Sequence, residues 1–362
     1  MRRVPWPLPV CLLLMLPHPA GRQAAPNQAP SSFAAEIAAL SEPGGYFDTD
    51  NLSSNEQSYL QVLPELEKRN VRGGAYIGVG PDQNFTYIAA VRPSIAFIID
   101  IRRDNLLLHL LFKALFAQSR TRIEYLAQLT GRPVPADVEP WRTAAIDRLI
   151  AYVDTTAASP SVEALRRKLD EAIAGTGVTL SADERNTVDR FHRRFIADGL
   201  SLRFQSAGRA PQEYNPTFRD LLRDRDAAGR QASYLANEDA FQFVKGLQSR
   251  DLVIPVTGDL SGTTAMPAIA RALAARHERV SAFYASNVEF YLFGAGAFGA
   301  FAANLGRLPH APNSVLIRSF FGRWAFSSRP GDASVSKLQA IDELLHEYAA
   351  GHIRQYADLA AR

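Results

Sequence analysis

The sequence predicts an α/β protein with a doubly wound, mainly parallel β-sheet and a large helical insertion. Short apolar segments typical of buried strands alternate with helical segments over residues 75–116, and the same alternation returns over residues 252–356. Between these stretches, residues 118–246 contain no convincing strand pattern. Strands that alternate with helices favour a parallel sheet whose strands are joined by crossover helices.

The N-terminal 25 residues have the pattern of a secretory signal peptide. Arg2 and Arg3 precede an apolar run, residues 8–16, and small residues follow around Ala20. We therefore predict an exported protein, with a disordered N-terminal extension as the alternative. The apolar run is too short to span a bilayer, and no later segment is long enough to do so. Residues 26–45, rich in Pro, Ala, Ser and Gly, predict a linker.

The charge of the chain gives no indication of nucleic-acid binding. There are 40 Lys and Arg residues against 37 Asp and Glu residues. Residues 1–25 contain three arginines and no acidic residue, so 37 basic and 37 acidic side chains remain after them. The single cysteine, Cys11, lies in the same segment, which excludes disulfides and cysteine metal sites from the mature chain.

Residues 46–118 predict the first half of the α/β domain. Ser53 and Glu56 have the spacing of a capping box, so we expect a helix to begin there and to be kinked or ended early by Pro64. The following segments predict a strand, a helix, a strand and a helix: residues 75–80, 85–91, 94–101 and 105–116.

Residues 119–250 predict the helical insertion, and residues 251–362 the second half of the α/β domain with a C-terminal helix. In the insertion, apolar residues recur at helical spacing, as at Leu165, Leu169 and Ile173, and the charges are balanced in sign. The second half predicts strands at residues 252–257, 280–285 and 314–321, and helices at residues 263–277, 289–301 and 335–356.

Candidate ligand-binding residues follow the predicted strands, because ligands of such sheets bind at the carboxyl ends of strands. Gly78 and Gly80 end the first strand, and Asp100 lies 20 residues further on, at the end of the second. A carboxylate there can accept the hydroxyl protons of a ribose. Asp259 ends the third strand and could meet an adenine amino group. The alternatives are a strand-end turn with a surface Asp100, and an Asx turn or helix cap at Asp259.

These residues resemble the class I S-adenosylmethionine-dependent methyltransferases, in the order Gly78 to Gly80, Asp100, Gly258-Asp259-Leu260 and Ser286-Asn287. Residues 51–105 also resemble an uncharacterised bacterial branch with a methyltransferase-like fold. The resemblance implies a Rossmann-like methyltransferase fold and contacts of the glycine turn with the methionine part, Asp100 with the ribose, and Asp259 and Leu260 with the adenine. It also allows Ser54, Asn55 and Glu56 to cover the pocket, although the capping box already accounts for Glu56. The residues it implies for S-adenosylmethionine are Gly78, Gly80, Pro81, Asp100, Asp259, Leu260 and Asn287.

The expected function is therefore an S-adenosylmethionine-binding, methyltransferase-like protein that methylates a small molecule. Glu289, Tyr284 and Asn287 lie on the expected acceptor side, but the sequence identifies no catalytic residue. Two alternatives stay open: an exported binding protein that retains the fold without catalysis, and an NAD-dependent oxidoreductase with the same Gly-to-Asp spacing. No metal site is expected, and the sequence makes no prediction of the oligomeric state.

Overall fold

 The computed structural model describes residues 32–361 with the exception of residues 50, 211, 327, 328 and 330. Residues 1–25, predicted as a signal peptide, lie outside the described part of the chain.

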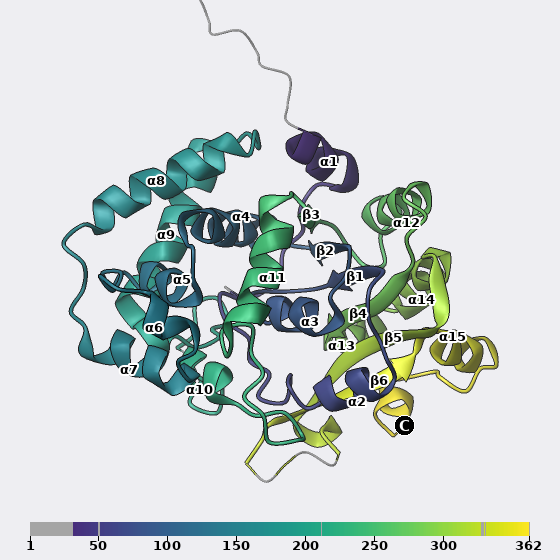
Figure 1. The fold of residues 1–362 in the computed structure, drawn as a ribbon. Coiled ribbons are helices and arrows are strands. Elements are labelled where there is room, and N and C mark those ends of the chain that lie inside the picture. Colours follow the sequence, from purple (N-terminus) through teal and green to yellow (C-terminus); the bar gives the residue numbers. More distant parts are fainter. Residues whose placement is uncertain (1–31, 50, 211, 327–328, 330, 362) are drawn as a thin grey trace, which may run out of the picture.

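Six strands form one sheet in the order β3-β2-β1-β4-β5-β6 (Figure 1). The first five strands are parallel to their neighbours, and β6 pairs antiparallel with β5. The predicted α/β class and mainly parallel sheet are therefore confirmed. The strand bounds are β1 Ala75–Gly78, β2 Ile95–Asp100, β3 Val253–Thr257, β4 Val280–Ser286, β5 His310–Phe321 and β6 Ser334–Ala340.

Helices cover both faces of the sheet (Figure 1). On one side lie α3 and α4, the helices that follow β1 and β2, and α11 packs against both of them. On the other side lie α12, α14 and α15. The bounds of the helices that follow strands are α3 Gln83–Val91, α4 Arg103–Gln118, α12 Ala265–Ala275, α13 Val288–Gly294, α14 Phe298–Arg307 and α15 Ile341–Ala349.

The segment between β2 and β3 is helical, and it packs over α4. Helices α8, α9 and α11 all contact α4, so these helices extend the layer that α3 and α4 begin. Within the described residues of this segment, the only β-structure is a pair of isolated bridges. The helices after α4 are α5 Arg122–Leu129, α6 Glu139–Arg142, α7 Ile146–Thr155, α8 Val162–Gly175, α9 Ala182–Asp198, α10 Phe218–Arg223 and α11 Glu238–Ser249.

The predicted linker at residues 26–45 is wrong where the structure describes it. Helix α1 (Ser32–Leu40) buries Phe33 and Ile37 and packs against β3 and α12. Beyond it, the Glu42 N–H donates to the Thr257 carbonyl at 2.9 Å. The composition suggested a linker because small residues dominate, but α1 presents an apolar face to the sheet layer.

The helix predicted to begin at Ser53 is also wrong. Residues 51–62 form turns and bends, and the helix α2 (Leu63–Lys68) begins ten residues after Ser53. Pro64 lies in the first turn of α2, where a backbone N–H has no partner within the helix, so proline costs no hydrogen bond there. The Glu56 side chain points inward instead of capping, and its oxygens bind Ser286 and Ser319.

The C-terminal helix predicted over residues 335–356 is replaced by three elements. They are the strand β6, the helix α15 and the short helix α16 (Tyr356–Ala360). Residues of β6 pair with β5 from Val315 opposite Ala340 to Phe321 opposite Ser334. This pairing gives hydrogen-bond partners to the backbone groups along the outer edge of β5. The spacing of apolar residues in the sequence does not reveal such a contact.

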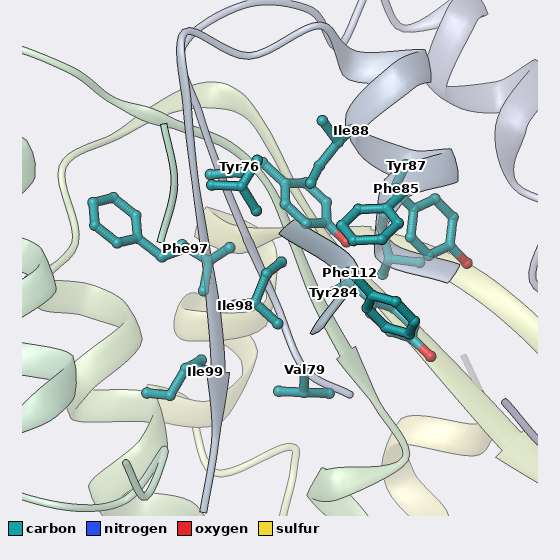
Figure 2. Close-up of a cluster of buried hydrophobic side chains, with 14 of the residues drawn as sticks. Tyr76, Val79, Phe85, Tyr87, Ile88, Phe97, Ile98, Ile99, Phe112 and Tyr284 are labelled. Atoms are coloured by element: carbon teal, nitrogen blue, oxygen red, sulfur yellow. The ribbon is translucent and has the colours of Figure 1, made fainter. Parts of the chain in front are cut away.

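The centre of the sheet is packed with large side chains from β1, β2, β4, α3 and α4 (Figure 2). Tyr76, Tyr87 and Tyr284 are fully buried and lie next to one another, with ring centroids 5.0 Å apart for Tyr87 and Tyr284 and 6.5 Å apart for Tyr76 and Tyr87. Strands buried on both faces account for the continuous apolar runs in the sequence.

A buried ion pair joins β5 to α13. The Arg318 Nε donates to Glu289 Oε2 at 2.7 Å, and Nη2 donates to Oε1 at 3.1 Å. The two side chains are 4% and 1% exposed. A bidentate pair of this kind holds α13 at a fixed angle on the sheet.

We expect Arg318→Met to lower the free energy of unfolding by about 3–5 kcal/mol, because it leaves the Glu289 carboxylate buried without its cation. The double variant Arg318→Met/Glu289→Met should be more stable than the single variant, since no charge is then buried. Urea denaturation of both variants measures the difference. A double variant no more stable than Arg318→Met would contradict this account.

Candidate functional site

A cavity of about 310 Å³ opens at the carboxyl ends of β1, β2, β3 and β4. It lies where the strand order reverses between β1 and β4, which is the usual ligand position in doubly wound sheets. Six of the seven candidate residues from the sequence line it, and Gly78 does not. The six are Gly80, Pro81, Asp100, Asp259, Leu260 and Asn287.

Gly78 does not line the cavity, but it leaves the space that the turn after β1 needs. A Cβ on Gly78 would lie 1.9 Å from Asn84 Oδ1, so only glycine leaves room for the Asn84 side chain. Gly80 has a φ of +83°, a conformation that favours glycine. The two glycines therefore have different roles: Gly78 admits a neighbouring side chain, and Gly80 makes the turn that borders the cavity.

The Asn84 amide holds this turn together. Its Nδ2 donates to the carbonyl oxygens of Val79, Gly80 and Pro81 at 2.9, 3.2 and 2.7 Å. Its Oδ1 accepts a hydrogen bond from the Tyr76 hydroxyl at 2.8 Å. Asn84 is fully buried, so these bonds are not exchanged with water.

His109 of α4 supports the same turn. Its Nε2 lies 2.9 Å from the Gly80 carbonyl oxygen. Burial lowers the pKa of His109 to about 4, so the ring is neutral at pH 7. A neutral ring in this contact carries its proton on Nε2 and donates it to the carbonyl.

The Asp100 carboxylate is paired with Arg102. Oδ1 accepts from the Arg102 N–H and Nε at 2.9 and 3.2 Å, and Oδ2 accepts from Nη2 at 3.1 Å. Arg102 Nη1 donates to the Thr49 carbonyl, which fixes the chain before α2 against the cavity. A carboxylate has about four acceptor positions, so Asp100 retains one for a ligand while Arg102 is bound.

Asp259 forms the Asx turn that the sequence left open as an alternative. Its Oδ1 accepts from the N–H and the hydroxyl of Ser261, both at 2.8 Å. Asn304 of α14 holds the same loop, donating from Nδ2 to the carbonyls of Leu260 and Gly262 at 2.9 and 2.7 Å. The loop therefore presents Asp259 and Leu260 to the cavity in a fixed conformation.

Glu56 lines the cavity, although the sequence pattern had assigned it to a helix cap. It accepts hydrogen bonds from the hydroxyls of Ser286 and Ser319. Burial is the main cause that raises the pKa of Glu56 above its ordinary value, and these hydrogen bonds partly oppose it. Ser286 has a φ of +53°, a strained conformation for a residue with a side chain. By contrast, Glu289 binds Arg318 and is not among the cavity-lining residues.

Aromatic side chains border the cavity. Phe47 and Tyr291 pack edge to face with ring centroids 4.8 Å apart, and Tyr291 is 43% exposed. Phe204 also lines the cavity and, with Asn55 and Asn287, lines a second, neighbouring cavity of about 760 Å³. The two cavities therefore share a wall. The sequence offered no signal for Phe47 or Phe204, because neither residue lies in a segment with regular apolar periodicity.

The charged residues that line the first cavity are three carboxylates and one guanidinium: Glu56, Asp100, Asp259 and Arg102. Asp100 and Arg102 compensate each other, which leaves an excess of negative charge at the cavity wall. Across the described part of the chain, no group of His, Cys, Asp and Glu side chains is arranged to hold a metal ion.

Residues 51–139 and 184–355 match the family described as domain of unknown function DUF7790. The chain belongs to this family. The matched ranges contain Glu56 and all seven candidate residues from the sequence, whereas the unmatched residues 140–183 carry α7 and α8. No curated protein shows significant similarity to the chain. Among the described residues, no helix is long and apolar enough to cross a membrane.

We expect Asn84→Ala to lower the free energy of unfolding by about 3 kcal/mol, because it leaves the Tyr76 hydroxyl and three carbonyls of the turn without their buried partner. Asn313→Ala, at an exposed position of β5, is the matched control and should change stability by less than about 0.5 kcal/mol. Urea denaturation compares the two. Equal losses in both variants would contradict the role given to Asn84.

A second prediction concerns Asp82, whose Oδ2 accepts from the Tyr234 hydroxyl at 3.0 Å. Burial raises the pKa of Asp82 to about 7. The unfolded chain loses this proton near pH 4 and the folded chain near pH 7, so stability falls as pH rises through that window. This loss of unfolding free energy between pH 4 and pH 8 should be on the order of a few kcal/mol, and Asp82→Asn should remove it.

Urea denaturation between pH 4 and pH 8 measures the effect. The exposed Asp170→Asn is the control and should retain the pH profile of the unchanged protein. Parallel profiles for Asp82→Asn and the unchanged protein would show that Asp82 is not the group responsible.

Proposed function

We propose that this cavity binds S-adenosylmethionine and that the protein is a methyltransferase-like member of its family acting on a small molecule. One observation carries the proposal: a single cavity collects residues from the ends of four parallel strands, at the reversal of the strand order. Its volume of about 310 Å³ is within the range of small-molecule sites, roughly 300–1,000 Å³.

The charge of the cavity supports an adenosyl ligand over a dinucleotide. NAD carries two phosphate groups, and a pyrophosphate needs positive charge or free N–H groups at a helix N-terminus. Here the residue before α3 is Asp82, and the cavity wall has an excess of carboxylates. S-adenosylmethionine instead has two cationic groups, a sulfonium and an ammonium, against one carboxylate, so its net charge is positive and a negative wall favours it.

The residues at the strand ends fit the parts of this ligand. Asp100 retains one acceptor position for a ribose hydroxyl while Arg102 holds its carboxylate in place. Leu260 offers an apolar surface next to Asp259 for the adenine ring. Bound there, S-adenosylmethionine would supply a methyl group to a nucleophile by in-line displacement at the sulfonium carbon.

The neighbouring cavity offers a binding place for the methyl acceptor. It shares Asn55 and Asn287 with the first cavity, so a molecule in one would approach a molecule in the other across these two amides. The chain would then act mainly by holding two reactants in line and excluding water from between them. An exported location, proposed from residues 1–25, would make a binding protein without catalysis the second candidate, since the methyl donor is a cytoplasmic compound.

Calorimetric titration of the protein with S-adenosylmethionine, S-adenosylhomocysteine and NAD tests the proposal. We expect both adenosyl compounds to bind and NAD not to bind. Asp100→Asn should weaken both adenosyl compounds by more than about tenfold, because a charge-assisted hydrogen bond to the ribose is lost. Asp104→Asn, on α4 outside this cavity, is the matched control.

Binding of NAD alone would overturn the proposal. Equal affinities in Asp100→Asn and the unchanged protein would show that the ribose does not bind at Asp100. Binding of the adenosyl compounds without methyl transfer to any acceptor would favour the non-catalytic candidate.

A further inference from the structure

Glu56 is a buried carboxylate without a cationic partner. The residue is 1% exposed, and no Lys, Arg or His side chain in the described part of the chain forms an ion pair with it. The acceptor sites of its carboxylate are used by hydroxyl groups, from Ser286 at the end of β4 and from Ser319 of β5. Arg102, which lines the same cavity, is paired with Asp100, and Arg318 of β5 is paired with Glu289.

The groups that face Glu56 from the surrounding elements are neutral. Tyr76 comes from β1, Tyr87 from α3 and Tyr284 from β4, and each has its pKa raised, chiefly by burial and further by the charge of Glu56. Burial also raises the pKa of Tyr356 of α16 well above its ordinary value, and the charges of Glu289 and Glu56 raise it further. Phenols with pKa values this high stay protonated near neutral pH, so they offer hydrogen bonds and no compensating charge.

Burying a carboxylate without a cation is costly, because hydroxyl groups replace only part of its hydration. The neighbouring Ser286 also holds a strained backbone conformation while it donates to Glu56. Both costs fall at the wall of the cavity, which Glu56 and Ser286 line together. An apolar residue in place of Glu56 would avoid both costs, so a carboxylate at this position indicates a partner that enters the cavity.

We propose that Glu56 is the specificity-determining residue of the cavity and that it recognises a positively charged group of the ligand. This inference rests on the proposed function, in which the charged group is the sulfonium or the ammonium of the methionine part. The cation would complete an ion pair that the chain itself leaves incomplete. Ser286 and Ser319 then act as positioning residues, since their hydroxyls orient the carboxylate.

The test compares ligands that share the adenosine part and differ in charge. S-adenosylmethionine carries a sulfonium, an ammonium and a carboxylate, S-adenosylhomocysteine carries the ammonium and the carboxylate, and adenosine carries none of these groups. We expect Glu56→Gln to weaken S-adenosylmethionine by at least about tenfold, because a charged partner is lost, and to change adenosine less than about twofold. Glu65→Gln, at a position on α2 outside the cavity, is the control.

Proton release gives a second readout that a purely structural role would not affect. Because burial raises the pKa of Glu56, a cation that binds beside it should displace a proton when the titration is run near that pKa. Calorimetry of S-adenosylmethionine in two buffers with different heats of ionisation measures this proton. We expect the release to vanish in Glu56→Gln and to increase in Ser319→Ala, which removes a donor to the ionised carboxylate.

Equal weakening of all three ligands in Glu56→Gln would overturn the inference, because Glu56 would then only maintain the shape of the cavity. Unchanged affinities for all three would overturn it as well. Failure of every adenosine compound to bind the unchanged, folded protein would instead overturn the proposed function.

Discussion

The turn between β1 and α3 depends on one buried amide. Asn84 donates to three consecutive carbonyl oxygens and accepts from Tyr76, so a single side chain satisfies backbone groups that would otherwise face the core unpaired. Asn304 does the same for the loop after β3. The cavity thus has two rigid walls. Asn84 of α3 fixes one of them from one face of the sheet, and Asn304 of α14 fixes the other from the opposite face.

The cavity combines this rigid frame with a costly arrangement of charges. Carboxylates line the cavity at the ends of apolar strands, and of these carboxylates only Asp100 is paired with a guanidinium, that of Arg102. Packing alone would favour apolar residues at such positions. A buried carboxyl group with a raised pKa that lines a cavity, as Glu56 does, is typical of functional sites, whereas the buried Arg318–Glu289 pair elsewhere in the fold is compensated and has a structural role.

Much of the sheet was predictable from the sequence, because β1 to β4 are short apolar runs that end in glycine or polar residues. The strand-end rule then identified the cavity residues Gly80, Asp100 and Asp259, and the family resemblance added Pro81, Leu260 and Asn287. Glu56 was assigned to a helix cap rather than to the site because Ser53 and Glu56 match a local capping pattern, while the actual partners of Glu56 lie more than 200 residues away. The strand β6 was missed for a similar reason, since its register depends on the open edge of β5.

The segment before the matched family range takes part in the cavity. Glu42 accepts the Asp259 N–H at 2.7 Å, and Phe47 and Thr49 line the cavity wall. The boundary of sequence similarity at residue 51 is therefore not a boundary of the folded unit. A shortened chain that began at residue 51 would keep every candidate ligand contact from the strand ends and yet lose one side of the enclosure around them.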